Sequence, residues 1–254
     1  MVQATDIAVR IGQHLHSSQI QGQIPELQRS YKESDFAEIP GFMPRDVQDA
    51  ARSELDELFR TAAKRRDLII QQSGNTPRKY DNLDRDVLNK HSEVIPFVFR
   101  SPALYEFVEN VVGEAVYPIP YIPEEFIASR LHKAGDVHGW HWDDYSWAIV
   151  WIFRVPDESI GGSLEYIPRV RWHRDDPRTA EIVARGPVLR RHPRAGSAYL
   201  LKAGTALHRV SPLREDAERM IVCYSFATAD ELTREVNHDS MAALYPESHV
   251  KHSG

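Results

Sequence analysis

Apolar residues in the first third of the chain recur at the spacing of amphipathic helices. After Pro44 the apolar positions follow one another at intervals of three and four, with charged residues between them: Val47, Ala51, Leu55, Leu58 and Ala62. The stretch SPALYEFVENVVG predicts a second helix, with Ser101 as N-cap, Pro102 in the first turn and Gly113 as the stop. We expect these helices to cover one face of a sheet.

The pattern changes after Gly113 to short β-type runs that are separated by Gly, Pro and Asp. The runs are YPIPYIPEEFIASRL, SWAIVWIFRV, GGSLEYIP, GSAYLLKAG, TALHRVSPL and ERMIVCYSFAT. Several short strands without long intervening helices predict a β-sandwich or barrel. Because SWAIVWIFRV is apolar at both alternations, we expect it to lie centrally, with helices on one face and an opposing sheet on the other.

The chain is interpreted as a single domain, because a β-rich domain of 254 residues can bury a sizeable core. We expect residues 1–254 to comprise a mostly helical part at 1–113, a β-rich core at 114–230 and a C-terminal helix or tail at 231–254. The stretch from Arg169 to Arg194 is rich in Arg, His, Asp and Pro, which indicates a solvated loop or a lid.

The net charge, the lengths of the apolar runs and the cysteine content argue against several classes of function. The formal net charge of −6 argues against a nucleic-acid binder, because phosphate contacts need a surplus of Lys and Arg. No apolar run approaches the roughly 18 residues of a membrane span, and the N-terminus lacks an export signal, so we expect a cytoplasmic protein with small-molecule substrates. Cys223 is the only cysteine, so any metal must take nitrogen and oxygen ligands.

The stretch HGWHWDDYSW carries the strongest candidate chemistry. On an extended backbone His141 and Asp143 project to the same side, which suits two ligands of one ion. A distant histidine, for which His208 in TALHRVSPL is favoured, would complete the 2-His-1-carboxylate face that binds non-haem Fe(II). A buried His–Asp hydrogen bond is the alternative, and Asp144 would replace Asp143 if the strand bends. The histidines that fit less well lie in the polar stretch or the C-terminal tail: His173, His192, His238 and His252.

Arg219 opens the run ERMIVCYSFAT. On a strand it shares one face with Ile221, Cys223 and Ser225, while the opposite face is apolar and belongs to the core. The Arg219 face then points into a cavity, where a buried guanidinium needs a bidentate carboxylate such as a 2-oxoacid provides. An edge-strand surface charge is the alternative interpretation. Tyr199 and Arg209 either contact the cosubstrate or have packing roles. Four tryptophans either line the cavity or belong to the core: Trp140, Trp142, Trp147 and Trp151.

The HxD pair at His141 and Asp143, the run GGSLEYIP, His208 and Arg219 together resemble the Fe(II)/2-oxoglutarate-dependent dioxygenases, over roughly residues 117–228. This resemblance implies a mainly β fold with flanking helices: a double-stranded β-helix (jelly roll, cupin-like) with the N-terminal helices packed on one sheet. It also implies Fe(II), 2-oxoglutarate as cosubstrate and O2. More narrowly, HGWHWDDYSW with TPRKY and YIPEEF is similar to the radical halogenases of free lysine and other amino acids, and to their hydroxylating relatives.

In the halogenating members of that group, glycine replaces the metal-binding carboxylate and chloride takes the vacated position. The corresponding residue here is Asp143, so the resemblance implies a hydroxylase and not a halogenase. Matching positions also imply a substrate shell of Arg78, Glu124, His138 and Asp144. Arg78 suits a substrate carboxylate, Glu124 and Asp144 suit ammonium groups, and His138 can hydrogen-bond either end.

The implied substrate is a free amino acid, with lysine favoured among the basic ones. Ornithine, arginine and neutral aliphatic amino acids stay open, because one methylene is worth only ~1–3 kcal/mol of discrimination. Glu125 is the rival of Glu124, since successive residues of a strand face opposite ways. Other open alternatives are a peptide- or carrier-tethered amino acid docked on the Arg-rich stretch, and a cupin-like protein that binds a metal without turnover. A homodimer is also open.

Overall fold

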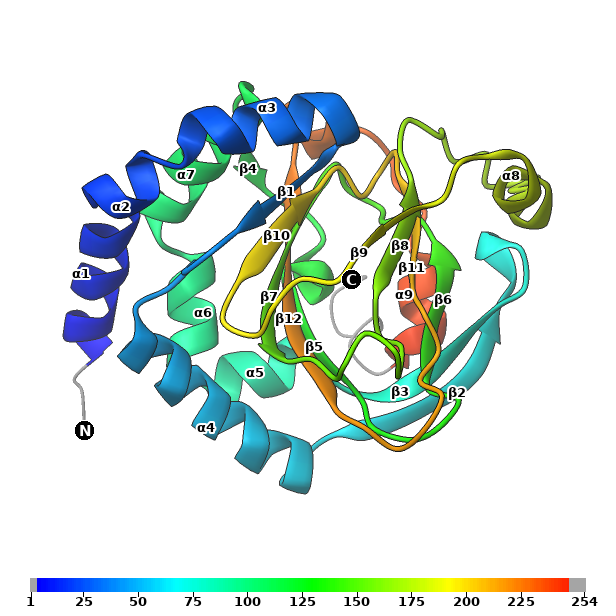
Figure 1. Cartoon of the computed structure of the whole chain (residues 1–254), viewed down its shortest axis with the longest axis horizontal. Helices are drawn as coiled ribbons and strands as arrows, with labels where there is room; N and C mark the ends of the chain where they lie inside the picture. The colour runs from blue at the N-terminus through cyan, green and yellow to red at the C-terminus, as the bar shows by residue number, and fades with distance from the viewer. Residues whose placement is uncertain (1–3, 247–254) are drawn as a thin grey trace.

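The computed structural model describes residues 4–246, in which twelve strands form one antiparallel sheet with helices on its outside (Figure 1). The strands are β1 Phe36–Ile39, β2 Lys64–Ile70, β3 Thr76–Leu83, β4 Tyr117–Pro118, β5 Phe126–Leu131, β6 Val137–His141, β7 Trp147–Arg154, β8 Leu164–Ile167, β9 Leu189–Arg191, β10 Ala198–Leu201, β11 Leu207–Val210 and β12 Arg219–Ala227. The α-helices are α1 Ala4–Leu15, α2 Ser18–Gln21, α3 Ile24–Ser34, α4 Arg45–Thr61, α5 Arg85–His91, α6 Val94–Phe99, α7 Pro102–Val112, α8 Thr179–Arg185 and α9 Asp239–Leu244, and the 3-10 turns are η1 Gln71–Ser73, η2 Ile122–Glu124 and η3 Asp230–Leu232. None of the described helices is both long and apolar enough to cross a membrane.

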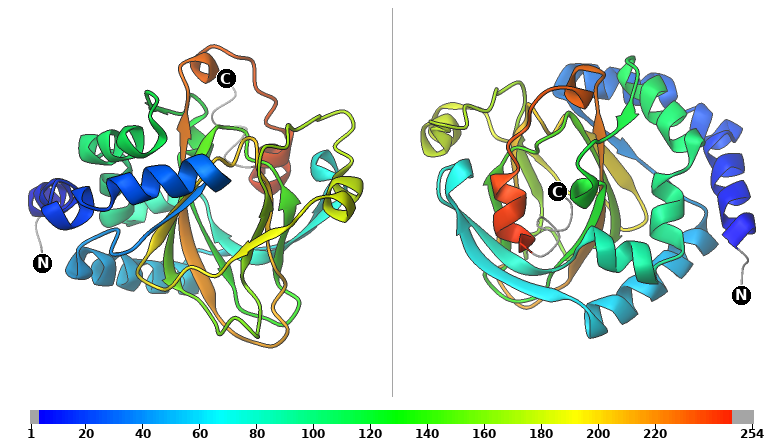
Figure 2. Two further views of the ribbon diagram at one scale, coloured as in Figure 1. Left: turned by 45° about the horizontal axis from the view of Figure 1, so that its top comes forward. Right: turned by 180° about the vertical axis from the view of Figure 1, so that it is seen from behind.

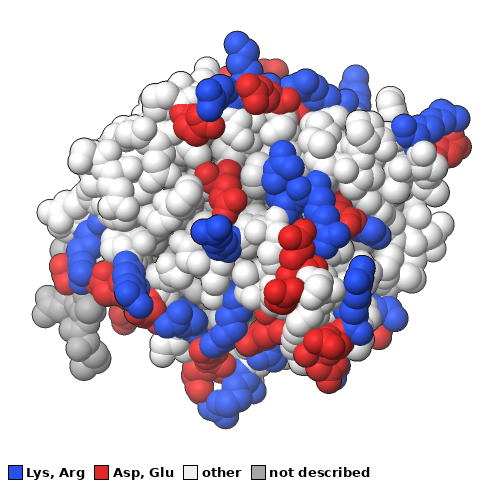
Figure 3. Space-filling model, in the orientation of Figure 1, with Lys and Arg blue, Asp and Glu red and all other residues white. Residues whose placement is uncertain are grey.

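The strand order β1-β10-β7-β12-β5-β3-β6-β11-β8-β9 pairs strands that are distant in the sequence, and β2 and β4 extend it at β3 and β12. The sheet curls round, so that β8 and β11 lie across the interior from β7 and β10, while most helices gather on the outer side of the β7 and β10 half (Figures 1 and 2). This is the jelly roll with flanking helices that the resemblance implied. Over the face in Figure 3, Lys and Arg side chains lie among Asp and Glu side chains.

Strand β7 lies centrally, as its apolar sequence predicted. It pairs with β10 on one side and β12 on the other. Its outward residues, which include Trp147 and Trp151, pack in the core beneath the helices. Its inward residues, which include Val150, pack with Leu164 and Tyr166 of the opposing strand β8. Both alternations are therefore apolar because both faces are covered.

The two predicted helices are confirmed. Helix α4 buries Val47, Ala51, Leu55 and Leu58 against the sheet. Helix α7 begins after Ser101 and ends at Gly113, whose φ of 78° is the left-handed conformation that favours glycine.

The N-terminal part also contributes strands β1, β2 and β3, which the hydrophobic pattern did not predict. The reason is clearest in β3, where the buried residues at alternate positions are Thr76, Arg78, Tyr80 and Asn82, and Leu83 is buried at the end of the strand. Polar side chains occupy the inner face of this strand, so apolar alternation, the usual signal of a half-buried strand, is missing.

The polar stretch from Arg169 to Arg194 contains α8 and β9, and β9 pairs with β8 at the edge of the sheet. The indole nitrogen of Trp172 donates to the carbonyl of Gln72 at 3.2 Å, and the Thr179 hydroxyl donates to the carbonyl of Ser73 at 2.8 Å. The stretch is therefore anchored on the turn that joins β2 to β3.

Phe99, the last residue of α6, joins the helical layer to the sheet. Its ring centroid lies 5.5 Å from that of Phe126, 6.1 Å from Tyr224 and 5.8 Å from Phe226. We expect Phe99→Ala to lower the free energy of unfolding by about 3–5 kcal/mol, because a buried ring is lost and a cavity remains. Urea denaturation measures this loss. Phe97→Ala, at a half-buried position of the same helix, is the control, and an equal loss in both variants contradicts the prediction.

Candidate active site

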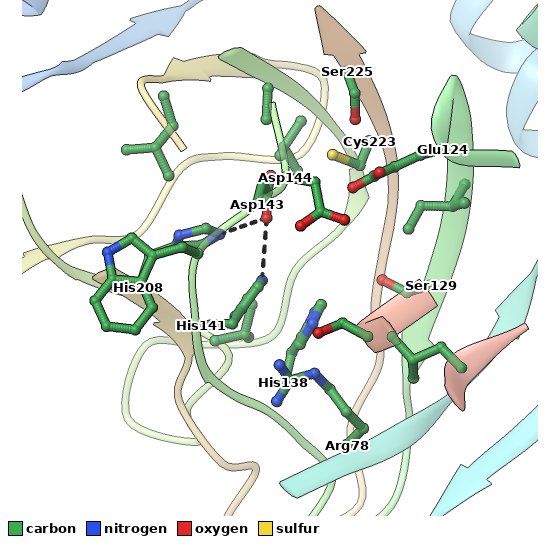
Figure 4. A pocket seen from close by; sticks show the side chains of 18 of the residues that line it. Arg78, Glu124, Ser129, His138, His141, Asp143, Asp144, His208, Cys223 and Ser225 are labelled. Atoms are coloured by element: carbon green, nitrogen blue, oxygen red, sulfur yellow. Dashed lines mark ion pairs between the residues drawn. The ribbon is translucent and has the colours of Figure 1, made fainter. Parts of the chain in front are cut away.

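Two histidines meet across neighbouring antiparallel strands. His141 ends β6, and the strand register places His208 of β11 directly opposite it. Asp143 follows two residues beyond the end of the strand, and its Oδ1 lies 3.5 Å from Nε2 of His141 and 3.5 Å from Nε2 of His208 (Figure 4). One ligand atom from each of the three residues lies within 4.8 Å of the others. The structure thus brings together the three side chains predicted as metal ligands.

Main-chain carbonyls orient both imidazoles. Nδ1 of His141 hydrogen-bonds the carbonyl oxygen of Gly139 at 2.8 Å, and Nδ1 of His208 hydrogen-bonds that of Ala206 at 2.8 Å. A carbonyl accepts only, so each Nδ1 carries the proton and each Nε2 keeps a lone pair directed toward Asp143. A hydrogen bond on the far ring nitrogen is the usual support of a metal-bound histidine.

The electrostatics of His141 and Asp143 also suit a cation. Burial, together with His208 and His138, holds the pKa of His141 well below its usual range, so this imidazole stays in the neutral form that binds metals. Burial raises the pKa of the Asp143 carboxyl, and a bound cation would offset that penalty on its charged form. Two neutral imidazoles and one carboxylate are the donor set of non-haem Fe(II) centres, and these residues fit that ion.

Arg219 lies on the inner face of β12 with 2% of its surface exposed. Burial lowers its pKa, and the hydroxyl of Tyr199 shares a hydrogen bond with it. Within residues 4–246 no carboxylate pairs with this guanidinium, and a buried charge that lacks an anion is costly. Ile221, Cys223 and Ser225 line the same pocket, as the alternation of β12 predicted. A ligand that brings a carboxylate into this pocket would therefore offset the buried charge of Arg219.

A second buried cation, Arg78, also lines the pocket and has 2% exposure. Its guanidinium donates to Thr76 Oγ1 at 3.0 Å and to the carbonyl of Pro77 at 3.1 Å, while its Nε has no partner. Burial lowers its pKa to about 10. The ring of His138, the strand neighbour of Arg78, stacks on His141 with centroids 4.1 Å apart. An anionic group beside Arg78 would therefore lie close to the metal ligands.

Glu124 and Asp144 form the acidic end of the pocket (Figure 4). Glu124 is 8% exposed and its Oε2 has no hydrogen-bond partner. Burial and the neighbouring Asp144 raise its pKa well above the usual range. The sequence placed Glu124 on a strand, but it ends the 3-10 turn η2, while Glu125 turns outward to Arg85 at 2.8 Å. Glu124 nonetheless faces the pocket.

Two residues at the acidic end were missed by the sequence interpretation. Nδ1 of His238 lies 3.3 Å from Oδ2 of Asp144 and 4.0 Å from Oε2 of Glu124. Arg174 lies 2.5 Å from Oδ1 of Asp144. Arg174 lies in the polar stretch and His238 in the C-terminal segment, neither of which was predicted to contribute to the site. Both are distant from Asp144 in the sequence, so no local sequence pattern indicates these contacts.

The remaining candidates separate into lining and packing residues. Tyr199, Trp142 and the unpredicted Trp172 line the pocket, whereas Trp147 and Trp151 belong to the core. Arg209 does not reach the pocket, because it pairs with Glu165 at 2.6 Å and lies over the ring of Trp140. His192 is held by Ser163 and the carbonyl of Pro156, and His252 lies outside the described residues.

A family model described as Halogenase D matches residues 20–246, and no curated protein matches the chain. The chain is similar in structure to SnoN, a non-haem α-ketoglutarate-dependent epimerase from nogalamycin biosynthesis, with 14% identity over 82% of each chain and a TM-score of 0.63. It is similar to a prolyl hydroxylase from Trichoplax adhaerens, solved with a hypoxia inducible factor peptide, with 11% identity over 85% of this chain and 96% of that one and a TM-score of 0.61. An oxidoreductase of the 2OG-Fe(II) oxygenase family from Burkholderia pseudomallei has 15% identity over 80% and 90% of the chains and a TM-score of 0.57, and at such identities the likeness is one of fold.

Proposed function

Because this chain belongs to the Halogenase D family, we propose that it is an Fe(II)/2-oxoglutarate-dependent oxygenase that hydroxylates an unactivated C–H bond of a free amino acid. Lysine is the first choice of substrate among the basic amino acids. Asp143 is the observation that carries the choice of hydroxylation over halogenation. Its carboxylate faces both histidines at 3.5 Å, so it takes the position that chloride needs in a halogenase.

Different side chains of the pocket bind the cosubstrate and the substrate. When bound, Fe(II) and 2-oxoglutarate supply oxidation by O2, in which one oxygen atom enters the product, the other enters succinate, and CO2 leaves. Arg219 holds the cosubstrate carboxylate through a bidentate contact. Arg78 binds the substrate carboxylate, and Glu124 with Asp144 binds an ammonium group. Together they direct one C–H bond toward the metal.

Anaerobic reconstitution tests this function directly. The protein is loaded with Fe(II) and 2-oxoglutarate in chloride buffer, and then receives O2 and a panel of free amino acids. We expect succinate and an amino-acid product heavier by one oxygen atom. A chlorinated product contradicts the role of Asp143, and iron binding without succinate from any substrate favours a cupin-like protein without turnover.

A carrier- or peptide-tethered amino acid is the second candidate substrate. It is favoured by an outer cavity that adjoins the pocket. Cations and carboxylates both line this cavity, and Arg171 and Lys202 are the cations that would attract an anionic arm. Tethered substrates are tested in the same assay. Turnover of a tethered amino acid without turnover of free ones replaces the first candidate with the second.

Glu124→Gln is expected to raise KM for lysine about ten- to a hundredfold, because the amide keeps the shape but loses the charge that binds the ammonium group. Since the pKa of Glu124 is raised, lysine binding should strengthen as pH increases and the carboxyl ionises, and the variant should lose this dependence. Glu125→Gln, which alters the outward neighbour, is the matched control and should leave KM unchanged. Equal KM values in both variants exclude Glu124 from substrate binding.

A further inference from the structure

Arg174 of the polar stretch reaches across the mouth of the pocket. Its Nη2 lies 2.5 Å from Oδ1 of Asp144, and its Nη1 donates to the carbonyl of Asn237 at 2.9 Å. The guanidinium also lies over the ring of Trp172, 3.7 Å from the centroid. The side chain of Asp144 is only 3% exposed, whereas that of Arg174 is 31% exposed. One side chain thus joins the polar stretch, the loop after β6 and the C-terminal segment.

The Arg174–Asp144 ion pair lies where two cavities meet. The outer cavity, of about 770 Å³, is lined by Arg174, by other cations and by carboxylates. The inner pocket holds the metal ligands and Glu124. Asp143, Asp144 and Trp172 line both cavities, so a ligand that moves from the outer cavity to the inner pocket passes this ion pair.

Arg174 pairs with the side chain of Asp144 at the acidic end of the pocket, whereas Arg234 donates to the main-chain carbonyl of Asp144 at 3.3 Å. Glu124, Asp144 and His238 offer ligand atoms within 4.8 Å of one another, and Oε2 of Glu124 has no hydrogen-bond partner in the described residues. A substrate ammonium group would reach Asp144 with a guanidinium already bound there. Two cations on one largely buried carboxylate repel each other, and this repulsion favours the departure of one of them.

We propose that Arg174 holds, in the free protein, the place that the substrate's ammonium group takes against Asp144, and that the substrate binds by displacing it. The inference rests on the proposed function, in which the substrate is a cationic amino acid. Arg174 then helps to determine specificity, because only a ligand that brings its own cation can take over Asp144. Its displacement also breaks the contacts with Asn237 and Trp172, and this frees the polar stretch.

Calorimetry with the anaerobic protein, loaded with Fe(II) and 2-oxoglutarate, measures the competition without turnover. Lysine is expected to bind Arg174→Met about tenfold more tightly than the unaltered protein, because no guanidinium has to leave. Methionine retains an apolar stem for Trp172. The matched control is Arg185→Met in α8: Arg185 pairs with Glu181 at 3.4 Å, its side chain is 75% exposed, and lysine affinity should not change.

Hydrogen exchange of residues 169–178 distinguishes displacement from a general effect of charge. Saturating lysine is expected to speed exchange in the unaltered protein, because Arg174 leaves its three contacts. In Arg174→Met, exchange of these residues should already be fast without lysine, and lysine should not change it. The proposal requires both results. It is overturned if Arg174→Met binds lysine no more tightly, or if lysine slows exchange in this segment or leaves it unaltered.

The probe n-butylammonium separates failure of this proposal from failure of the substrate assignment. In one outcome no amino acid binds the unaltered protein, but n-butylammonium binds Arg174→Met more tightly than it binds the unaltered protein. The substrate assignment then fails and the displacement of Arg174 stands. If lysine binds both proteins equally and exchange does not rise, the displacement fails and the proposed function stands. If neither ligand binds any of the proteins, both fail.

Discussion

His208→Ala is expected to lower succinate formation by at least about a hundredfold and to remove stoichiometric Fe(II) binding. In the proposed centre His208 supplies one of three protein ligand atoms, and loss even of a residue that merely supports a ligand commonly costs 10- to 100-fold in metal affinity or activity. Metal analysis after gel filtration measures the iron, and a coupled assay measures the succinate.

The control for this variant is His91→Ala, because His91 is exposed at the end of α5, on the helical side of the sheet. Both variants should melt at similar temperatures without metal, since the imidazole of His208 faces the pocket and the truncation leaves the helical core intact. An active His208→Ala protein with bound iron would exclude His208 as a ligand.

Arg219→Met is expected to raise KM for 2-oxoglutarate by about a hundredfold or more. A bidentate contact between a guanidinium and a carboxylate makes two charge-assisted hydrogen bonds, each worth roughly 1.5–3 kcal/mol, and methionine makes neither. Initial rates at saturating iron and amino acid measure the effect. Arg219→Lys should recover only part of the affinity, because an ammonium cannot match the planar fork.

Thermal melting checks that this loss comes from binding and not from unfolding. Arg219 is a buried charge without an anionic partner among residues 4–246, so Arg219→Met should be at least as stable as the unaltered protein when 2-oxoglutarate is absent. Added 2-oxoglutarate should raise the melting temperature of the unaltered protein alone, because a ligand stabilises only the folded state that binds it. Equal stabilisation of both proteins would place the cosubstrate elsewhere.

Much of the site is determined by the sequence, because its signals are local. An HxD pair at the end of a strand places two ligands within two residues, and the alternation of ERMIVCYSFAT decides that Arg219 faces the pocket while Met220 faces the core. The helices and the central strand are determined in the same way, since their burial follows from apolar periodicity.

The tertiary structure alone decided the features that depend on contacts distant in the chain. Apolar alternation does not predict β3, because its inner face is polar; the resemblance carried by TPRKY indicated Arg78, but only the folded chain shows that Tyr80 lines the same pocket. The roles of the two adjacent aspartates depend on their partners: Asp143 faces His208, whereas Asp144 faces Arg174, 30 residues away, and His238, 94 residues away. Periodicity reports which side of an element is buried, but only the folded chain reports which charges share that buried space.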